Sequence, residues 1–150
     1  MRRALALLPL LALLAAGCGG DGESETGPMP RAEYTRKANA ICAEAERKLD
    51  ALGGFKSYDE LSKEMKRGEQ ALRKSVADLR KLRPPANLRA GHEEFVSLQQ
   101  ETADIAASIA VAAGADDNLE MQKQAERADK VTGSANEAAR KIGLEGCVAG

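Results

Sequence analysis

Apolar residues recur at every third or fourth position along most of the chain after residue 30. This spacing predicts α-helices, because residues three and four apart lie on the same face of a helix. Four such helices are expected, over residues 31–52, 57–83, 87–113 and 117–142. Residues that favour strands are sparse, so the pattern predicts an all-α fold.

Short polar signals mark where two of these helices begin. Ser57 is followed three residues later by Glu60, which is the spacing of a capping box. Asp117 and Glu120 repeat this spacing before the last helix. Because the loops between the helices are short, neighbouring helices are expected to run antiparallel. The sequence therefore predicts an up-down-up-down four-helix bundle.

Glycine and proline positions indicate how these helices pack and end. Gly68 lies where the apolar stripe of the second helix would continue, which predicts a close contact with a neighbouring helix. Pro84 and Pro85 end that helix. Gly143 is the expected left-handed stop of the fourth helix, after which the chain can turn back along the first.

The N-terminal residues follow the order of a secretory signal. Arg2 and Arg3 precede an apolar run over residues 4–16, and small residues then lead to Cys18. The run of about 13 residues is shorter than the roughly 20 that a membrane-spanning helix needs. We expect residues 1–17 to be a signal peptide and not a membrane span.

The end of this signal resembles the lipobox of bacterial lipoproteins, in which a cysteine receives a lipid and a peptidase cuts before it. Residues 14–18 read Leu-Ala-Ala-Gly-Cys, although that family most often has Leu where this chain has Ala15. The resemblance implies that Cys18 carries the lipid (palmitate) and anchors the protein to the outer face of the plasma membrane. The alternative is an ordinary secreted protein cleaved near Ala16. Both alternatives predict an extracytoplasmic domain.

A tether is expected between this cysteine and the first helix. Residues 19–30 contain Gly, Pro and acidic residues and almost no apolar side chain, a composition that is typical of a flexible linker. The predicted organisation is thus a lipidated cysteine with its tether over residues 18–30, followed by one helical domain over residues 31–150.

The cysteine count fits this organisation. Three cysteines would leave one unpaired in a secreted protein. If Cys18 carries lipid, Cys42 and Cys147 remain and can form a disulfide in an oxidising compartment. The four residues that end at Cys147 can reach about 13 Å when extended, enough to return along the first helix. We expect this disulfide to close the bundle.

The charge balance excludes one class of function. The chain has 22 Lys and Arg residues against 23 Asp and Glu residues, no Trp, and two each of Tyr and Phe. A nucleic-acid-binding protein would show a strong positive balance and aromatic side chains for stacking. Nucleic-acid binding is therefore not expected.

Basic residues nevertheless gather at the end of the predicted bundle where the tether enters. An anionic membrane could attract them, with about 1 kcal/mol from each residue near the surface. The helix dipole is the alternative explanation, since it favours cations at helix C-termini. It accounts for the basic residues that end the second and fourth helices, but not for those that begin the first. The predicted membrane-facing residues are Arg31, Arg36, Lys37, Arg80, Lys81, Arg83, Arg89, Arg140 and Lys141.

No pattern typical of a catalytic, metal or cofactor site occurs. His92 is the only histidine, and Val96 stands where a zinc protease helix has its second histidine. Dimetal bundles need two Glu-x2-His pairs, whereas Arg89 precedes His92 here. No serine lies in a Gly-x-Ser-x-Gly elbow. We expect a protein that is not an enzyme, with His92 at the surface or half-buried.

Three runs of residues resemble one group of proteins. They are Tyr-x3-Ala-Asn-Ala-Ile-Cys over 34–42, Leu-Arg-Pro-Pro over 82–85 and Gly-Leu-x2-Cys over 143–147. Together with the lipobox they resemble small, functionally uncharacterised lipoproteins of high-GC actinobacteria. The resemblance implies a helical domain with a cysteine pair, and it implies no activity.

Two functions are compatible with these features. The first is a membrane-anchored binding or scaffold protein of the cell envelope, which docks a partner protein through the polar faces of its bundle. The alternative is a small-ligand sensor or receptor with a pocket between helices. The bulky residues that could line such a pocket, or simply fill the core, are Tyr34, Phe55, Tyr58, Met65, Phe95 and Met121.

Overall fold

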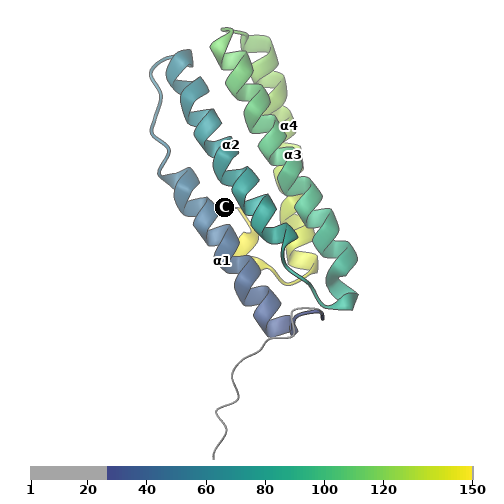
Figure 1. The fold of residues 1–150 in the computed structure, drawn as a ribbon. Coiled ribbons are helices and arrows are strands. Elements are labelled where there is room, and N and C mark those ends of the chain that lie inside the picture. Colours follow the sequence, from purple (N-terminus) through teal and green to yellow (C-terminus); the bar gives the residue numbers. More distant parts are fainter. Residues whose placement is uncertain (1–26, 150) are drawn as a thin grey trace, which may run out of the picture.

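The computed structural model describes residues 27–149, and within them the chain forms four antiparallel helices (Figure 1). No strand occurs in this range. The predicted all-α four-helix bundle is confirmed. The predicted signal peptide, the lipidated Cys18 and most of the tether lie outside the described residues. The elements are α1 (Arg31–Asp50), α2 (Tyr58–Arg80), the short 3-10 helix η1 (Ala86–Leu88), α3 (Arg89–Gly114), α4 (Asn118–Lys141) and the 3-10 helix η2 (Glu145–Cys147).

The predicted start signals act as helix caps. The Ser57 hydroxyl accepts a hydrogen bond from the Glu60 backbone N–H at 3.2 Å, and the Asp117 carboxylate accepts one from the Glu120 N–H at 3.0 Å. The Glu60 carboxylate does not complete the box on Ser57; it accepts from the Lys56 N–H at 2.7 Å. Each of these bonds satisfies a backbone donor that the first turn of a helix leaves free.

Three predicted helix boundaries are wrong by two or three residues, including the end of the second helix, which is Arg80 and not residue 83. The first helix ends at Asp50 and not at residue 52. The third α-helix begins at Arg89, because the backbone carbonyl of Pro85 accepts from the Leu88 N–H at 2.8 Å and winds the preceding residues into a 3-10 turn.

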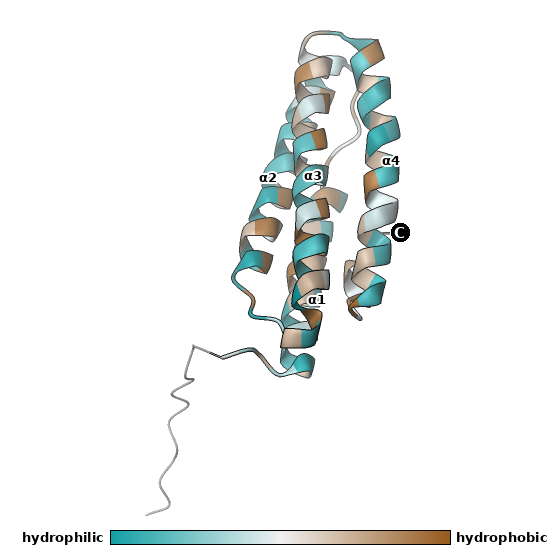
Figure 2. Cartoon of the chain, turned by 90° about the vertical axis from the view of Figure 1, so that its right-hand side faces the viewer, coloured by the Kyte–Doolittle hydropathy of each residue, from teal (hydrophilic) through white to brown (hydrophobic). Residues whose placement is uncertain are grey.

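The core is densest at the end of the bundle where α1 begins. Its largest fully buried side chains are Tyr34, Phe95, Leu79, Ile105, Leu144 and Val76. Between α3 and α4 the buried residues are mostly alanines, which allow the two helices to pack closely. None of the described helices has the apolar length that crossing a bilayer requires, and Figure 2 shows hydrophilic residues recurring along the lengths of α2 and α4.

Two glycines mark close contacts of the helices. A Cβ atom on Gly68 would lie 3.3 Å from Leu52 Cδ1 and 3.5 Å from Leu49 Cδ2, so the predicted close approach at Gly68 is confirmed. Gly91 is tighter still: a Cβ there would lie 2.4 Å from Ile142 Cγ2. The start of α3 therefore meets the end of α4 without room for a side chain.

The bundle is open between α1 and α4. Within the described chain these two helices have no Cα atoms within 8 Å of each other, and α1 packs instead on α2 and on η2. Gly143 has a φ of +77° and reverses the chain as predicted, so that the C-terminal segment runs back beside α1 (Figure 1). The fully buried Leu144 belongs to this segment. The residues after α4 thus occupy part of the space between α1 and α4, where they contact both helices.

The disulfide predicted between Cys42 and Cys147 is present. It joins α1 to η2 across 105 residues of sequence, with a Cα–Cα distance of 5.1 Å. Asn136 of α4 secures the residues that follow, because its side-chain amide exchanges two hydrogen bonds with the Ala149 backbone, at 2.9 and 3.1 Å. The C-terminal segment is therefore bonded to α1 through the disulfide and hydrogen-bonded to α4 through Asn136.

Candidate functional site

The antiparallel topology brings all nine of the basic residues named from the sequence to one end of the bundle. They lie in the first two turns of α1, at the end of α2 and in the turn after it, at the start of α3 and at the end of α4. Residues 27–30 reach the bundle at the same end, where the Met29 N–H donates to the Arg83 carbonyl at 2.8 Å. We call this end the basic pole.

Most basic side chains of the pole have no carboxylate partner. Lys37 pairs with Glu33 at 2.7 Å and Lys81 pairs with Asp78 at 2.8 Å. The other seven form no ion pair within residues 27–149; these are Arg31, Arg36, Arg80, Arg83, Arg89, Arg140 and Lys141. Seven of the nine basic side chains of the pole are thus without a direct carboxylate contact in this range.

The rest of the bundle away from the pole, including its other end, shows the opposite arrangement, and we call this part its sides. Basic residues there are paired with a carboxylate in eight cases: Arg47, Lys48, Lys63, Arg67, Arg73, Lys74, Lys123 and Arg127. Hydrogen bonds from Lys74 and Lys81 hold the pKa of the Asp78 carboxyl below its usual value. Only Lys56, Lys66 and Lys130 lack such a partner among the described side residues. Unpaired positive charge is therefore concentrated at the pole.

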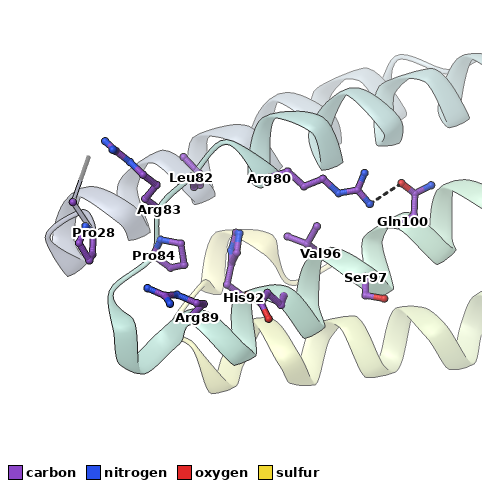
Figure 3. A pocket seen from close by; sticks show the side chains of 12 residues that line it. Pro28, Arg80, Leu82, Arg83, Pro84, Arg89, His92, Val96, Ser97 and Gln100 are labelled. Carbon is purple, nitrogen blue, oxygen red and sulfur yellow. Dashed lines mark hydrogen bonds between the residues drawn. The ribbon is translucent and has the colours of Figure 1, made fainter. Parts of the chain in front are cut away.

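A cavity of about 540 Å³ opens at this pole. Arg80, Arg83 and Arg89 line it together with a single carboxylate, Glu93. Figure 3 shows that the three guanidinium groups point in different directions, and Arg80 reaches along α2 to donate to the Gln100 side chain at 3.3 Å. An arginine can donate two parallel hydrogen bonds to a phosphate. This spread of donors fits several anionic groups on a surface better than one enclosed anion.

His92 also lines this cavity, but its imidazole belongs to the core. It is 5% exposed, so the prediction of a surface or half-buried histidine is wrong. The Tyr34 hydroxyl and His92 Nδ1 are 3.0 Å apart, and the rings meet edge to face with centroids 5.6 Å apart. Burial lowers the pKa of His92, opposed by its contact with the Leu79 backbone and by the charge of Glu93. Burial also raises the pKa of Tyr34 to about 12.

The geometry assigns the Tyr34–His92 pair a structural role. With the imidazole neutral and the phenol protonated, the Tyr34 hydroxyl donates to Nδ1 and ties α1 to α3. Within the described part of the chain, no three His, Cys, Asp or Glu side chains are grouped as metal ligands. The pair therefore satisfies two buried polar groups of the core.

The bulky residues named for a ligand pocket do not come together. Tyr34 and Phe95 are fully buried in the core, whereas Phe55 and Tyr58 are exposed at the other end of the bundle. None of the six lines the cavity at the basic pole. Tyr34 and Phe95 instead fill the core, which is the other role expected for these bulky residues.

A second hollow, which we call the α1–α4 cleft, lies between helices, but none of the six bulky residues named from the sequence lines it. It has a volume of about 320 Å³ and opens where α1 and α4 fail to meet, beside the disulfide. Its lining combines apolar residues such as Leu49 and Leu72 with polar ones such as Ser75, Gln99 and Thr132. These residues form no distinctive sequence pattern, so only the packing of the helices reveals it.

The described fold and its pole define a disulfide-closed helical bundle with one strongly basic end. No known protein family model matches the chain, and no match to it was found among the curated proteins or among the solved structures.

Proposed function

We propose that this chain is a lipid-anchored binding protein of the cell envelope that docks its basic pole onto the anionic headgroups of the membrane. The bundle then projects outward and presents its polar sides to an envelope partner. The observation that supports this proposal is that seven unpaired basic side chains surround the point where residues 27–30 join the bundle.

The position of the tether favours this orientation. The hydrogen bond from Met29 to Arg83 fixes the entry of the chain beside the arginines of the pole. An anchor that precedes residue 27 would therefore hold the pole towards the surface in which it is embedded. Basic residues near an anionic surface contribute about 1 kcal/mol each, and this attraction decays within a Debye length of roughly 10 Å.

The helix dipole alone does not explain the charges. It favours cations at the C-termini of α2 and α4, where Arg80 and Arg140 lie. Arg31 and Arg89, however, are the first residues of α1 and α3, where the dipole of their own helix disfavours a cation, although the Arg31 guanidinium also lies beside Gly143 at the end of α4. Neither has a carboxylate partner within residues 27–149. An external anionic surface supplies a reason for their position.

Vesicle sedimentation tests the proposal. The core and the disulfide lie within the described residues, so a chain of residues 19–150 keeps the whole bundle while lacking Cys18. We expect this chain to sediment with phosphatidylglycerol vesicles at about 20 mM salt, to be released at about 300 mM, and to ignore phosphatidylcholine vesicles. Absence of sedimentation at low salt would contradict the proposal.

A further inference from the structure

The α1–α4 cleft is a hollow inside the bundle that the membrane-docking proposal does not use. The C-terminal segment covers the side of α1 near the disulfide, up to Ala149. Beyond it, towards the C-terminal half of α1, the gap between α1 and α4 stays open over about 320 Å³. Pockets for small molecules usually measure about 300–1,000 Å³, so the cleft has the size of a small ligand site.

Polar groups without partners lie among the apolar walls of this cleft. Ser75 is 6% exposed, and its hydroxyl makes no hydrogen bond within residues 27–149. It lies on α2 between the cleft and a shallower groove on the outer side of α1 and α2. The Gln99 amide and the Thr132 hydroxyl, which also line the cleft, likewise have no partner in that range. Gln99 and Thr132 are half-buried, so solvent can reach the cleft, and a ligand there would find these polar groups free to hydrogen-bond.

The charge of the cleft is opposite to that of the basic pole. Its lining includes two carboxylates, Glu46 and Asp50, one turn apart on α1, and no Lys, Arg or His. Neither carboxylate forms an ion pair with another described residue. Both are exposed, so they lie at the mouth of the cleft while Leu49 and Leu72 form its apolar wall. A cation with an apolar body therefore matches this lining.

We propose that the α1–α4 cleft binds a small organic cation, an amine or a quaternary ammonium compound with an apolar body. The apolar body packs against Leu49, Leu72 and Ala135, and the cationic group lies at Glu46 and Asp50. Ser75, Gln99 and Thr132 hydrogen-bond to polar groups of the ligand or to water that it retains. This binding site is independent of the basic pole, which lies at the opposite end of α1.

A series of three probes with the same apolar body tests the charge preference. Phenylbutylamine, phenylbutanol and phenylbutyrate are titrated into residues 19–150, and binding is followed through backbone amide shifts in NMR spectra. We expect the amine to bind about fivefold more tightly than the alcohol, the ratio that an exposed ion pair supplies, and the carboxylate to bind most weakly. The shifts should centre on Ser75, Gln99 and Thr132. Shifts elsewhere, no shifts at millimolar probe, or equal binding of all three probes would overturn the proposal.

Filling the cleft tests its location. Ala135→Leu places a larger side chain in the cleft and should weaken phenylbutylamine binding at least tenfold, about 1.4 kcal/mol. Ala125→Leu is the matched control, since Ala125 is exposed on the same helix and does not line the cleft. If circular dichroism shows that Ala135→Leu is unfolded, Thr132→Leu replaces it, because Thr132 is only half-buried. A folded cleft-filling variant that binds the amine as the wild type does would refute the site.

Neutralising the two carboxylates at the mouth of the cleft tests the contribution of their charge separately from the shape of the cleft. The pair Glu46→Gln and Asp50→Asn should abolish the preference for the amine over the alcohol while leaving alcohol binding unchanged. The pair Asp129→Asn and Glu137→Gln changes the net charge equally on the exposed face of α4 and should leave the preference intact. A preference that survives the first pair of substitutions would contradict the role of the carboxylates.

Discussion

The buried hydrogen bond between Tyr34 and His92 shows how single residues fix the base of this bundle. It joins α1 to α3 with a Tyr hydroxyl and an imidazole that are both almost inaccessible to solvent. The caps at Ser57 and Asp117 could be predicted from the sequence because each involves a residue only three positions away. The burial of His92 could not, because its partner lies 58 residues earlier and is brought to it only by helix packing.

The lowered pKa of the buried His92 predicts how the free energy of unfolding depends on pH. Burial lowers its pKa in the folded protein below the value of 6.5 that applies to the unfolded chain. Below that value the unfolded state therefore binds more protons, and stability falls as the pH drops. Well above pH 6.5, His92 is neutral in both the folded and the unfolded state, so its contribution to stability no longer changes with pH.

Urea unfolding at about pH 7.5 and about pH 5.5 measures this effect. We expect the wild type to be less stable at the lower pH and His92→Gln to show a smaller difference between the two. Identical pH dependence in the two proteins would exclude His92 as the source.

At the same end of the bundle, the packing around Gly91 leaves no room for a larger side chain. Gly91→Ala would place a Cβ 2.4 Å from Ile142 Cγ2, so the Ile142 side chain or the backbone of one helix would have to shift. We expect it to lower the free energy of unfolding by about 1–3 kcal/mol, as overpacking usually does. Gly133→Ala is the control: Gly133 lies in α4 with nothing within 4 Å of a Cβ there, and alanine should stabilise this helix by up to about 1 kcal/mol. Urea unfolding that ranks the two variants the other way would contradict this packing.

At the scale of elements, α1 differs from the other helices. It packs on α2 on one side and on the C-terminal segment on the other, and it does not reach α4. Hydrophobic spacing could predict the four helices because each is amphipathic by itself. It could not predict the gap beside α1, because that gap depends on where residues 143–149 lie after the chain reverses at Gly143.

The disulfide should therefore stabilise α1 more than the rest of the bundle. In the chain-entropy model, closing a loop of this length contributes about 4–5 kcal/mol, so Cys42→Ser with Cys147→Ser should lower the melting temperature by many degrees. Hydrogen exchange of the folded variant should increase first in α1 and in residues 144–149, and least in α3. Uniform exchange, or an unchanged melting temperature, would show that the disulfide has no such role.

At the scale of the whole molecule, the antiparallel topology separates two regions of opposite charge. The basic pole could be predicted from the sequence. Alternating helix directions alone place the N-termini of α1 and α3 and the C-termini of α2 and α4 at the same end of the bundle. Which of its residues lack carboxylate partners required the side-chain contacts of the structure. The pole faces the side on which residues 27–30 enter, and the carboxylates of the α1–α4 cleft lie near the other end of α1.

Two variants of equal charge test membrane docking most directly. The pole variant combines Arg31→Gln, Arg36→Gln and Arg83→Gln; the side variant changes the three unpaired lysines of the sides, Lys56, Lys66 and Lys130, to Gln. Binding of residues 19–150 to phosphatidylglycerol vesicles is measured at low salt. We predict about a hundredfold weaker binding for the pole variant and at most a few-fold change for the side variant. Equal losses in the two variants would mean that net charge, and not the pole, governs binding, and would contradict the account.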